Sequence, residues 1–251
     1  MRRWRPVVGA LVRVGALVLV GACTTDPPTE PLIPVFRVAI TGAPADNVVL
    51  IDRTIQLDAA ALGPGDEPLP DRDIAWSSLA TDIATVDGDG RVDTHALGSV
   101  DIRATSDGVT GVLPLSVREG TTVPGQGNTR FVTLLGGKLH LAIRVGSAPG
   151  GTVVHVREAV TWPANERIIP GTVVEIGPLG TQFAEPMTTG VSFVPTEIPA
   201  AERDQLRLFG VDASGEWVEL PQPNVDLNDF IVEADLMRLT TVAIFRPTLT
   251  P

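Results

Sequence analysis

The chain has 251 residues, of which 43% are hydrophobic and only 4% are aromatic, with no tyrosine. Its 30 acidic residues outnumber the 19 basic ones, which gives a formal net charge of −11, and the only lysine is Lys138. This composition argues against nucleic acid as a partner, because such binding depends on neutralising phosphates with lysine and arginine.

The first 22 residues have the pattern of an export signal. A basic segment, MRRWR, precedes an apolar stretch, VVGALVRVGALVLV, and small residues follow. That order is typical of secretory signal peptides. A retained membrane-spanning helix is the alternative, but the apolar stretch is short for one and Arg13 interrupts it. We predict that residues 1–22 are a signal peptide.

The only cysteine, Cys23, directly follows this segment, and a single thiol cannot form an internal disulfide. Residues 20–23, VGAC, resemble the lipobox of bacterial lipoproteins. The resemblance implies cleavage before Cys23, which would then carry a diacylglyceryl thioether and an N-acyl chain. Several such chains would anchor the protein firmly, since each buried methylene contributes about 0.8 kcal/mol. The alternative is a cysteine that is discarded with the signal peptide.

The mature chain would be strongly acidic and held at a membrane. Cleavage before Cys23 leaves 15 basic and 30 acidic residues, a formal net charge of −15, and such a surface promotes solubility. Thr24 stands where an inner-membrane retention signal would often place aspartate, so resemblance to other lipoproteins favours the outer membrane. Residues 23–34 contain four prolines, which predicts an extended spacer of roughly 30 Å at about 3 Å per residue.

Residues 35–118 show short runs of alternating apolar and polar residues, which predicts a first β-sandwich domain. In VDIRA the apolar Val100, Ile102 and Ala104 fall on one face of a strand. The residues from Asp87 to Gly90, DGDG, predict a hairpin turn, because Gly and Asp tolerate the positive φ angles that such turns need.

The same region resembles a known family. The runs IQLDA, IAWSSLATDIATVDGDGRV and GSVDIRATSDG occur in the order expected of the bacterial immunoglobulin-like group 2 domain of invasin and intimin type. The resemblance implies a spacer or adhesive module of a surface protein. It also implies that Trp76 is a core residue.

We predict a linker over residues 119–130, EGTTVPGQGNTR, because it is rich in Gly and Thr and poor in large apolar groups. Residues 131–251 predict a second β domain from runs such as KLHLAI, TVVHV and TVVEIGP. Only PAAERDQL, near residue 200, indicates a helical turn. The predicted fold class is therefore all-β, with two tandem β-sandwich domains.

The second domain resembles a divergent ZU-five-type β-sandwich from about Gly137 to Phe245. The resemblance depends on IIPGTVVEIGPLGTQFAEPMTTGVSFVP, LRLFGVDASGEWVELP and TTVAIF. Some relatives cleave themselves at a His-Phe-Ser sequence, but this chain has Arg238-Leu239-Thr240 in the region most like it. Without that histidine and serine the nucleophile is missing, so we predict no self-cleavage and interpret Thr240 as a strand residue.

No catalytic or metal-binding motif is recognisable. The chain contains no G-x-S-x-G, H-E-x-x-H or phosphate-binding-loop sequence. The only histidines are His95, His140 and His155. His140, between two leucines, is expected to point away from their face, and His155 lies in a similar run. A zinc site would need these two strands to be adjacent. We predict no enzyme activity, no cofactor and no metal.

Two further features keep alternatives open. The acidic group of Asp82, Asp87, Asp89 and Asp93 fits an exposed hairpin turn, and a weak calcium site near Asp87 and Asp89 is the alternative. Trp162 and Trp217 are expected to pack in a core, and sugar stacking is the alternative.

These observations predict a non-enzymatic lipoprotein of the cell envelope, anchored to a membrane through Cys23. Its sandwiches would serve adhesion, spacing or interaction with an unidentified protein or glycan, since binding residues commonly lie in loops. The alternative function is that of a carbohydrate-binding envelope protein.

Overall fold

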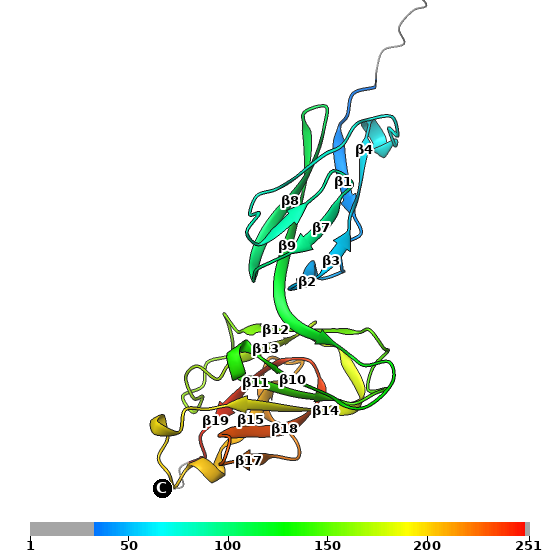
Figure 1. Ribbon diagram of the computed structural model, residues 1–251. Helices are drawn as coiled ribbons and strands as arrows, with labels where there is room; N and C mark the ends of the chain where they lie inside the picture. The colour runs from blue at the N-terminus through cyan, green and yellow to red at the C-terminus, as the bar shows by residue number, and fades with distance from the viewer. Residues whose placement is uncertain (1–32, 249–251) are drawn as a thin grey trace, which may run out of the picture. The chain divides into compact units, whose positions relative to one another are not determined.

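The computed structural model describes residues 33–248 and consists of strands joined by turns (Figure 1). The predicted signal peptide, Cys23 and most of the proline-rich spacer lie outside the described residues. The all-β prediction is confirmed. Within the described part of the chain, the helical segments are single 3₁₀ turns: η1 (Pro64–Asp66), η2 (Leu135–Gly137), η3 (Pro195–Glu197) and η4 (Arg203–Gln205). The last of these lies in PAAERDQL, as the sequence indicates.

The first sandwich comprises β1 to β8 and the first part of β9. Sheets form between β1 and β4, among β5, β8, β9 and β2, and among β3, β7 and β6. The strands are β1 (Arg37–Thr41), β2 (Val48–Leu50), β3 (Thr54–Gln56), β4 (Asp58–Leu62), β5 (Ala75–Ser78), β6 (Ala84–Val86), β7 (Arg91–Thr94), β8 (Gly98–Ser106) and β9 (Val109–Thr122).

Alternating apolar residues of this sandwich face its core, as the sequence predicts. Val100, Ile102 and Ala104 on β8 are buried. Trp76 on β5 packs against two neighbouring apolar clusters, which confirms its core position. A Cβ atom at Gly90 would lie 2.9 Å from the Trp76 ring, and Gly90 has a φ of 80°. Glycine at the β6–β7 turn therefore permits the positive φ of the turn and leaves room for the Trp76 indole.

The second sandwich comprises the end of β9 and all later strands. One sheet has the order β10–β11–β14–β18–β17, and the other β16–β15–β19–β13–β12–β9. The strands are β10 (Arg130–Leu134), β11 (Leu139–Ile143), β12 (Val153–Glu158), β13 (Val174–Gly177), β14 (Gln182–Ser192), β15 (Arg207–Val211), β16 (Trp217–Glu219), β17 (Asn224–Asp226), β18 (Ile231–Arg238) and β19 (Thr241–Phe245). A large apolar core, mostly aliphatic but including Phe183 and Phe193, lies between these two sheets.

Strand β9 belongs to both sandwiches (Figure 1). It pairs with β8 over residues 109–117 and with β12 over residues 119–122. The first four residues of the expected linker are therefore strand. The β-branched Thr121 and Thr122 favour extended backbone, and the following Val123 is buried in the second core.

Among residues 33–248, no helix has the length and apolar composition that crossing a bilayer requires.

Candidate functional site: the joint between the two sandwiches

A row of three residues crosses the second sandwich where the first one meets it. His155 on β12 pairs with Gly120 on β9 and with Gly177 on β13. The imidazole lies against Gly177, where a Cβ atom would come within 3.0 Å of Nδ1. A Cβ atom at Gly120 would lie 2.6 Å from Cδ2 of Leu50, which belongs to the first sandwich. The two glycines thus leave room for one side chain from each sandwich.

His155 is buried, with only 3% of its surface exposed. Because His155 lies in a run like that of His140, the sequence predicts that it is an exposed strand residue. This prediction is wrong. In β12 the neighbours Val154 and Val156 fill the core, as alternation requires. The other face, which carries His155, is covered by a loop of the first sandwich. The residues around His155 in the sequence cannot predict this burial, because the loop lies far away in the chain.

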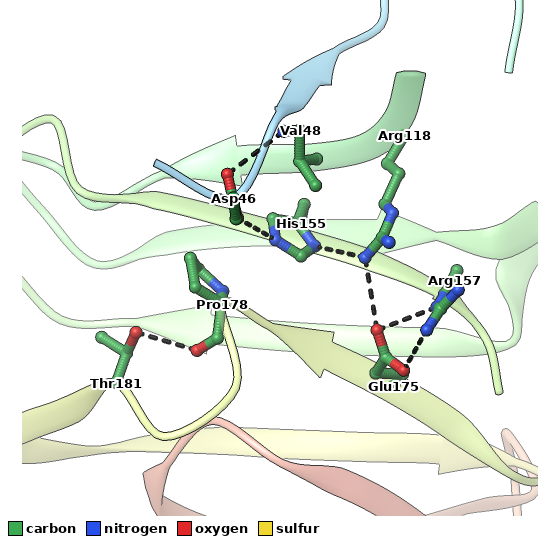
Figure 2. Close-up of polar contacts among 8 residues, drawn as sticks. All are labelled: Asp46, Val48, Arg118, His155, Arg157, Glu175, Pro178 and Thr181. Carbon is green, nitrogen blue, oxygen red and sulfur yellow. Dashed lines mark hydrogen bonds and ion pairs between the residues drawn. The ribbon is translucent and has the colours of Figure 1, made fainter. Parts of the chain in front are cut away.

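His155 joins the two sandwiches through both ring nitrogens (Figure 2). Its Nε2 lies 2.9 Å from Oδ2 of Asp46, and its Nδ1 lies 3.2 Å from Nη1 of Arg118. A guanidinium group can only donate, so Nδ1 accepts this hydrogen bond. Nε2 then carries the proton of the neutral imidazole, and this N–H donates a hydrogen bond to the Asp46 carboxylate. In this assignment the neutral His155 ring bridges the carboxylate of Asp46 and the guanidinium of Arg118.

The loop that carries Asp46 is fixed by its own hydrogen bonds. Oδ1 of Asp46 accepts from the backbone N–H of Val48 at 3.1 Å, which leaves Oδ2 for His155. The backbone N–H of Asn47 donates to the carbonyl of Pro44 at 2.9 Å, and Asn47 has a φ of 55°. Asparagine tolerates this left-handed conformation better than most residues. The carboxylate is therefore pre-positioned before it meets the second sandwich.

Glu175 on β13 anchors the other end of the network. Its carboxylate accepts from Nε and Nη2 of Arg157 at 2.8 and 2.6 Å, and from Nη1 of Arg118 at 3.2 Å (Figure 2). Glu175 is 8% exposed. A buried carboxylate costs several kcal/mol unless it is paired, and the bidentate arginine geometry supplies that pairing. Arg118 is thereby held in place beside His155.

Burial lowers the pKa of His155 below its ordinary value of 6.5, and the nearby positive charge of Arg118 lowers it further. The hydrogen bond that His155 donates to Asp46 and the charges of Asp46 and Glu175 oppose this shift but do not reverse it. Burial and Arg157 also lower the pKa of Arg118. That guanidinium stays protonated at physiological pH, because even a lowered arginine pKa lies far above neutrality.

The other sequence-predicted histidine lies elsewhere. His140 on β11 points away from the buried Leu139 and Leu141, as predicted, and its Nε2 lies 3.0 Å from both the Gly137 carbonyl and Oγ of Ser192. It belongs to the five-stranded sheet, whereas His155 belongs to the opposite sheet. Their strands are not adjacent, and no group of three or more metal-ligand side chains occurs in the described part of the chain.

The acidic group of the first sandwich forms a turn. The hairpin between β6 and β7 is confirmed. Oδ1 of Asp87 accepts from the backbone N–H groups of Asp89 and Arg91 at 3.0 and 2.9 Å. The hydroxyl of Thr54 donates to Asp93 and lowers the pKa of that carboxyl. The Asp87 carboxylate is occupied by its own hairpin and that of Asp93 by Thr54 of β3, which favours the turn interpretation over calcium binding.

The two tryptophans of the second sandwich differ in exposure. Trp217 is half-buried, donates its indole N–H to the Pro163 carbonyl at 2.7 Å and lies edge-on to Phe245. Trp162 is 44% exposed, so the prediction that it packs in a core is wrong for this residue. It lies between β12 and β13 in a segment without regular structure.

Thr240 is not a strand residue. It lies between β18 and β19 with 9% of its surface exposed, and its hydroxyl donates to the Val211 carbonyl. Its carbonyl accepts from the Ile176 N–H at 3.0 Å. The backbone here leaves the ladder so that the chain can pass from one sheet to the other. The absence of self-cleavage stays a prediction.

Sequence reasoning missed Asp46, Arg118 and Glu175 as members of one site. One signal was available, because Glu175 stands between valine and isoleucine in a run that is otherwise apolar, VVEIG. A charge buried by such a pattern needs a partner. The sequence could not name that partner, since the contacts bring together residues far apart in the chain.

Comparisons with known proteins support the fold of the first sandwich. Residues 39–117 match the family model described as the bacterial Ig-like domain (group 2). The first sandwich contains an Ig-like domain. The expected resemblance is confirmed for this part of the chain, whereas the lipoprotein and ZU-five-type resemblances stay predictions. The search of curated proteins gave no match.

Solved structures with similarity include intimin and an S-layer protein. A mutant of intimin from EHEC O157:H7 is 24% identical, with 36% of this chain and 53% of that chain covered and a TM-score of 0.26. Intimin in the intimin–Tir90 complex is 26% identical, with 35% and 52% covered and a TM-score of 0.26. Domains 4 and 5 of the S-layer protein SbsC are 14% identical, with 86% and 94% covered and a TM-score of 0.28. The chain spans about half the length of the intimin structures it matches.

Proposed function

We propose that this protein is a non-enzymatic lipoprotein of the bacterial cell envelope that presents its second sandwich to a partner at a fixed orientation. The observation that carries the proposal is the joint, which consists of β9 and the contacting side chains of Asp46, Arg118, His155 and Glu175. A strand common to both sandwiches continues across it, and the contacts of Asp46, His155 and Arg118 link the two sides. Domains that are joined only by a flexible linker move relative to one another by default. A joint of this kind suits a spacer.

The Ig-like domain and the N-terminal sequence support a position of this spacer at a membrane. Cys23 would carry the lipid, and residues 23–34 would separate the first sandwich from the bilayer. The first module would be residues 35–118, and the second would begin at residue 119, because residues 119–122 pair with β12. We propose the outer membrane as the site of anchoring, on the basis of Thr24.

Metabolic labelling tests the anchor. Cells that express the wild-type chain are fed labelled palmitate beside cells that express Cys23→Ala, and the purified proteins are compared. We expect label in the wild type and its loss in the variant, with a wild-type N-terminus at Cys23. An unlabelled protein that begins at Met1 would contradict the proposal. Protease treatment of intact cells then shows whether the sandwiches face the outside.

The exposure of Trp162 favours glycan binding as a second candidate function. An exposed indole can stack on a sugar ring, whereas the indole of Trp217 is held by its hydrogen bond and by Phe245. A glycan array probed with the mature chain tests this candidate. Glycan binding that is lost in Trp162→Ala and kept in Trp217→Ala would support it, and binding to no glycan would leave a protein as the expected partner.

A further inference from the structure

The neutral state of His155 is built into the contacts of the joint. Its Nδ1 accepts from Arg118, so a second proton on the ring would occupy the position that now receives the guanidinium N–H. Two N–H groups would then point at each other, and both would belong to cations. The imidazolium form therefore loses one of the two hydrogen bonds of His155.

Arg118 has little freedom to move aside. Its Nη1 also donates to Glu175, which the bidentate contact with Arg157 holds in turn. The opposing side of the ring lies against Gly177 on the sheet. Water can hydrate the imidazolium only if the covering loop of the first sandwich leaves. The arrangement of the joint thus couples the charge of one ring to the position of a loop.

We propose that protonation of His155 releases the loop carrying Asp46 from the second sandwich, so that the joint is stiff near neutral pH and loosens in acid. This inference rests on the stiff joint of the proposed function, and it does not depend on the lipid anchor. It adds a regulatory property, because the presented sandwich would gain freedom of movement when the surroundings become acidic.

The charges around His155 act in opposite directions. Arg118 of β9 disfavours the imidazolium, whereas Asp46 of the loop and Glu175 of β13 favour it. Taken alone, the attraction of Asp46 would tighten the joint in acid. Burial is the largest effect, and the pKa of His155 is lowered overall. By linkage, protons then favour the open state, in which the ring is exposed and binds them more readily.

Distance measurements between the sandwiches test the inference. The chain starting at residue 24 keeps every described residue and has no cysteine, so Asp89→Cys and Ala213→Cys introduce one exposed label site in each sandwich. Pulsed electron paramagnetic resonance gives the distance distribution at about pH 7.5 and about pH 5, the range in which histidine acts as a switch. We expect a narrow distribution at the higher pH and a broader one at the lower.

Two variants separate His155 from the other histidines. His155→Gln keeps a neutral side chain at both pH values, so its distribution should not change with pH. His140→Gln, on the opposite sheet, should broaden in acid like the parent. If His155→Gln does not fold, a magnetic resonance titration of the histidine rings in the parent gives the same information, and His155 should titrate below its ordinary value together with the broadening.

The outcomes distinguish the inference from the proposed function. A broad distribution already at about pH 7.5 would contradict the stiff joint itself. A distribution that stays narrow down to about pH 5 would overturn only the pH response. A broadening that persists in His155→Gln, or a His155 that titrates above its ordinary value, would also overturn it.

Discussion

At the scale of single residues, the joint depends on two glycines as much as on its charged groups. Gly120 and Gly177 flank His155 in register, and each leaves space that a side chain of the joint occupies. Neither has the positive φ that commonly explains a glycine in a turn. Their role is to permit close approach, so even the smallest added side chain should be costly.

Gly177→Ala tests this role. Its Cβ atom would overlap the His155 ring, and forcing an extra methyl group into a packed site costs about 1–3 kcal/mol of unfolding free energy. Gly88→Ala is the matched control, because nothing lies within 4 Å of its Cβ position. Urea unfolding of the two variants should show the loss only in the first. Equal effects would show that the space over Gly177 is not needed.

Glu175→Gln tests the buried charge. The substitution removes the negative charge that pairs with Arg118 and Arg157, so the unfolding free energy should fall by roughly 3 kcal/mol. Glu158→Gln is the control, since Glu158 pairs with Lys138 on the surface and should contribute less than about 1 kcal/mol. A Glu175→Gln protein as stable as the control would contradict the account of the network.

At the scale of elements, the sequence predicts strands well where one face is buried and the other is exposed to solvent. Alternation located β8, and the Asp-Gly turn located the β6–β7 hairpin. The linker prediction failed for residues 119–122, because the small and β-branched residues in EGTT also suit a strand that pairs with β12. Composition could not identify β12 as the partner, which is more than 30 residues further along the chain.

Hydrogen exchange distinguishes the strand from a linker. The amides of residues 119–122 should be protected like those of the rest of β9, because they lie in a strand that is paired with β12. Residues 125–128 are exposed and outside any strand, so their amides should exchange rapidly. Magnetic resonance detection resolves the two groups. Fast exchange throughout residues 119–128 would restore the linker interpretation.

At the scale of the whole molecule, alternation and motif order predicted the all-β class and the first sandwich, but not the joint. The contact between Asp46 and His155 spans 109 residues. Each residue looks ordinary in its own segment, one in a polar turn and the other in an apolar strand. Only the folded arrangement shows that the turn covers the strand.

The stability of the whole chain should depend on pH through this contact. The pKa of His155 is lowered in the folded state, so the unfolded chain binds more protons as the pH falls below about 6.5. Folding stability should therefore be complete above that value and decline towards the lowered pKa. Urea unfolding at a series of pH values measures the decline. His155→Gln should flatten it, and an unchanged decline in that variant would assign it to other groups.

The most direct test of the central claim is whether the two sandwiches tumble as one body. Residual dipolar couplings of backbone amides, measured in a weakly aligned sample near neutral pH, report the orientation of each sandwich separately. The account predicts that one alignment tensor fits the amides of both sandwiches. Two tensors of clearly different magnitude would mean that the sandwiches move independently, and the stiff joint would be contradicted.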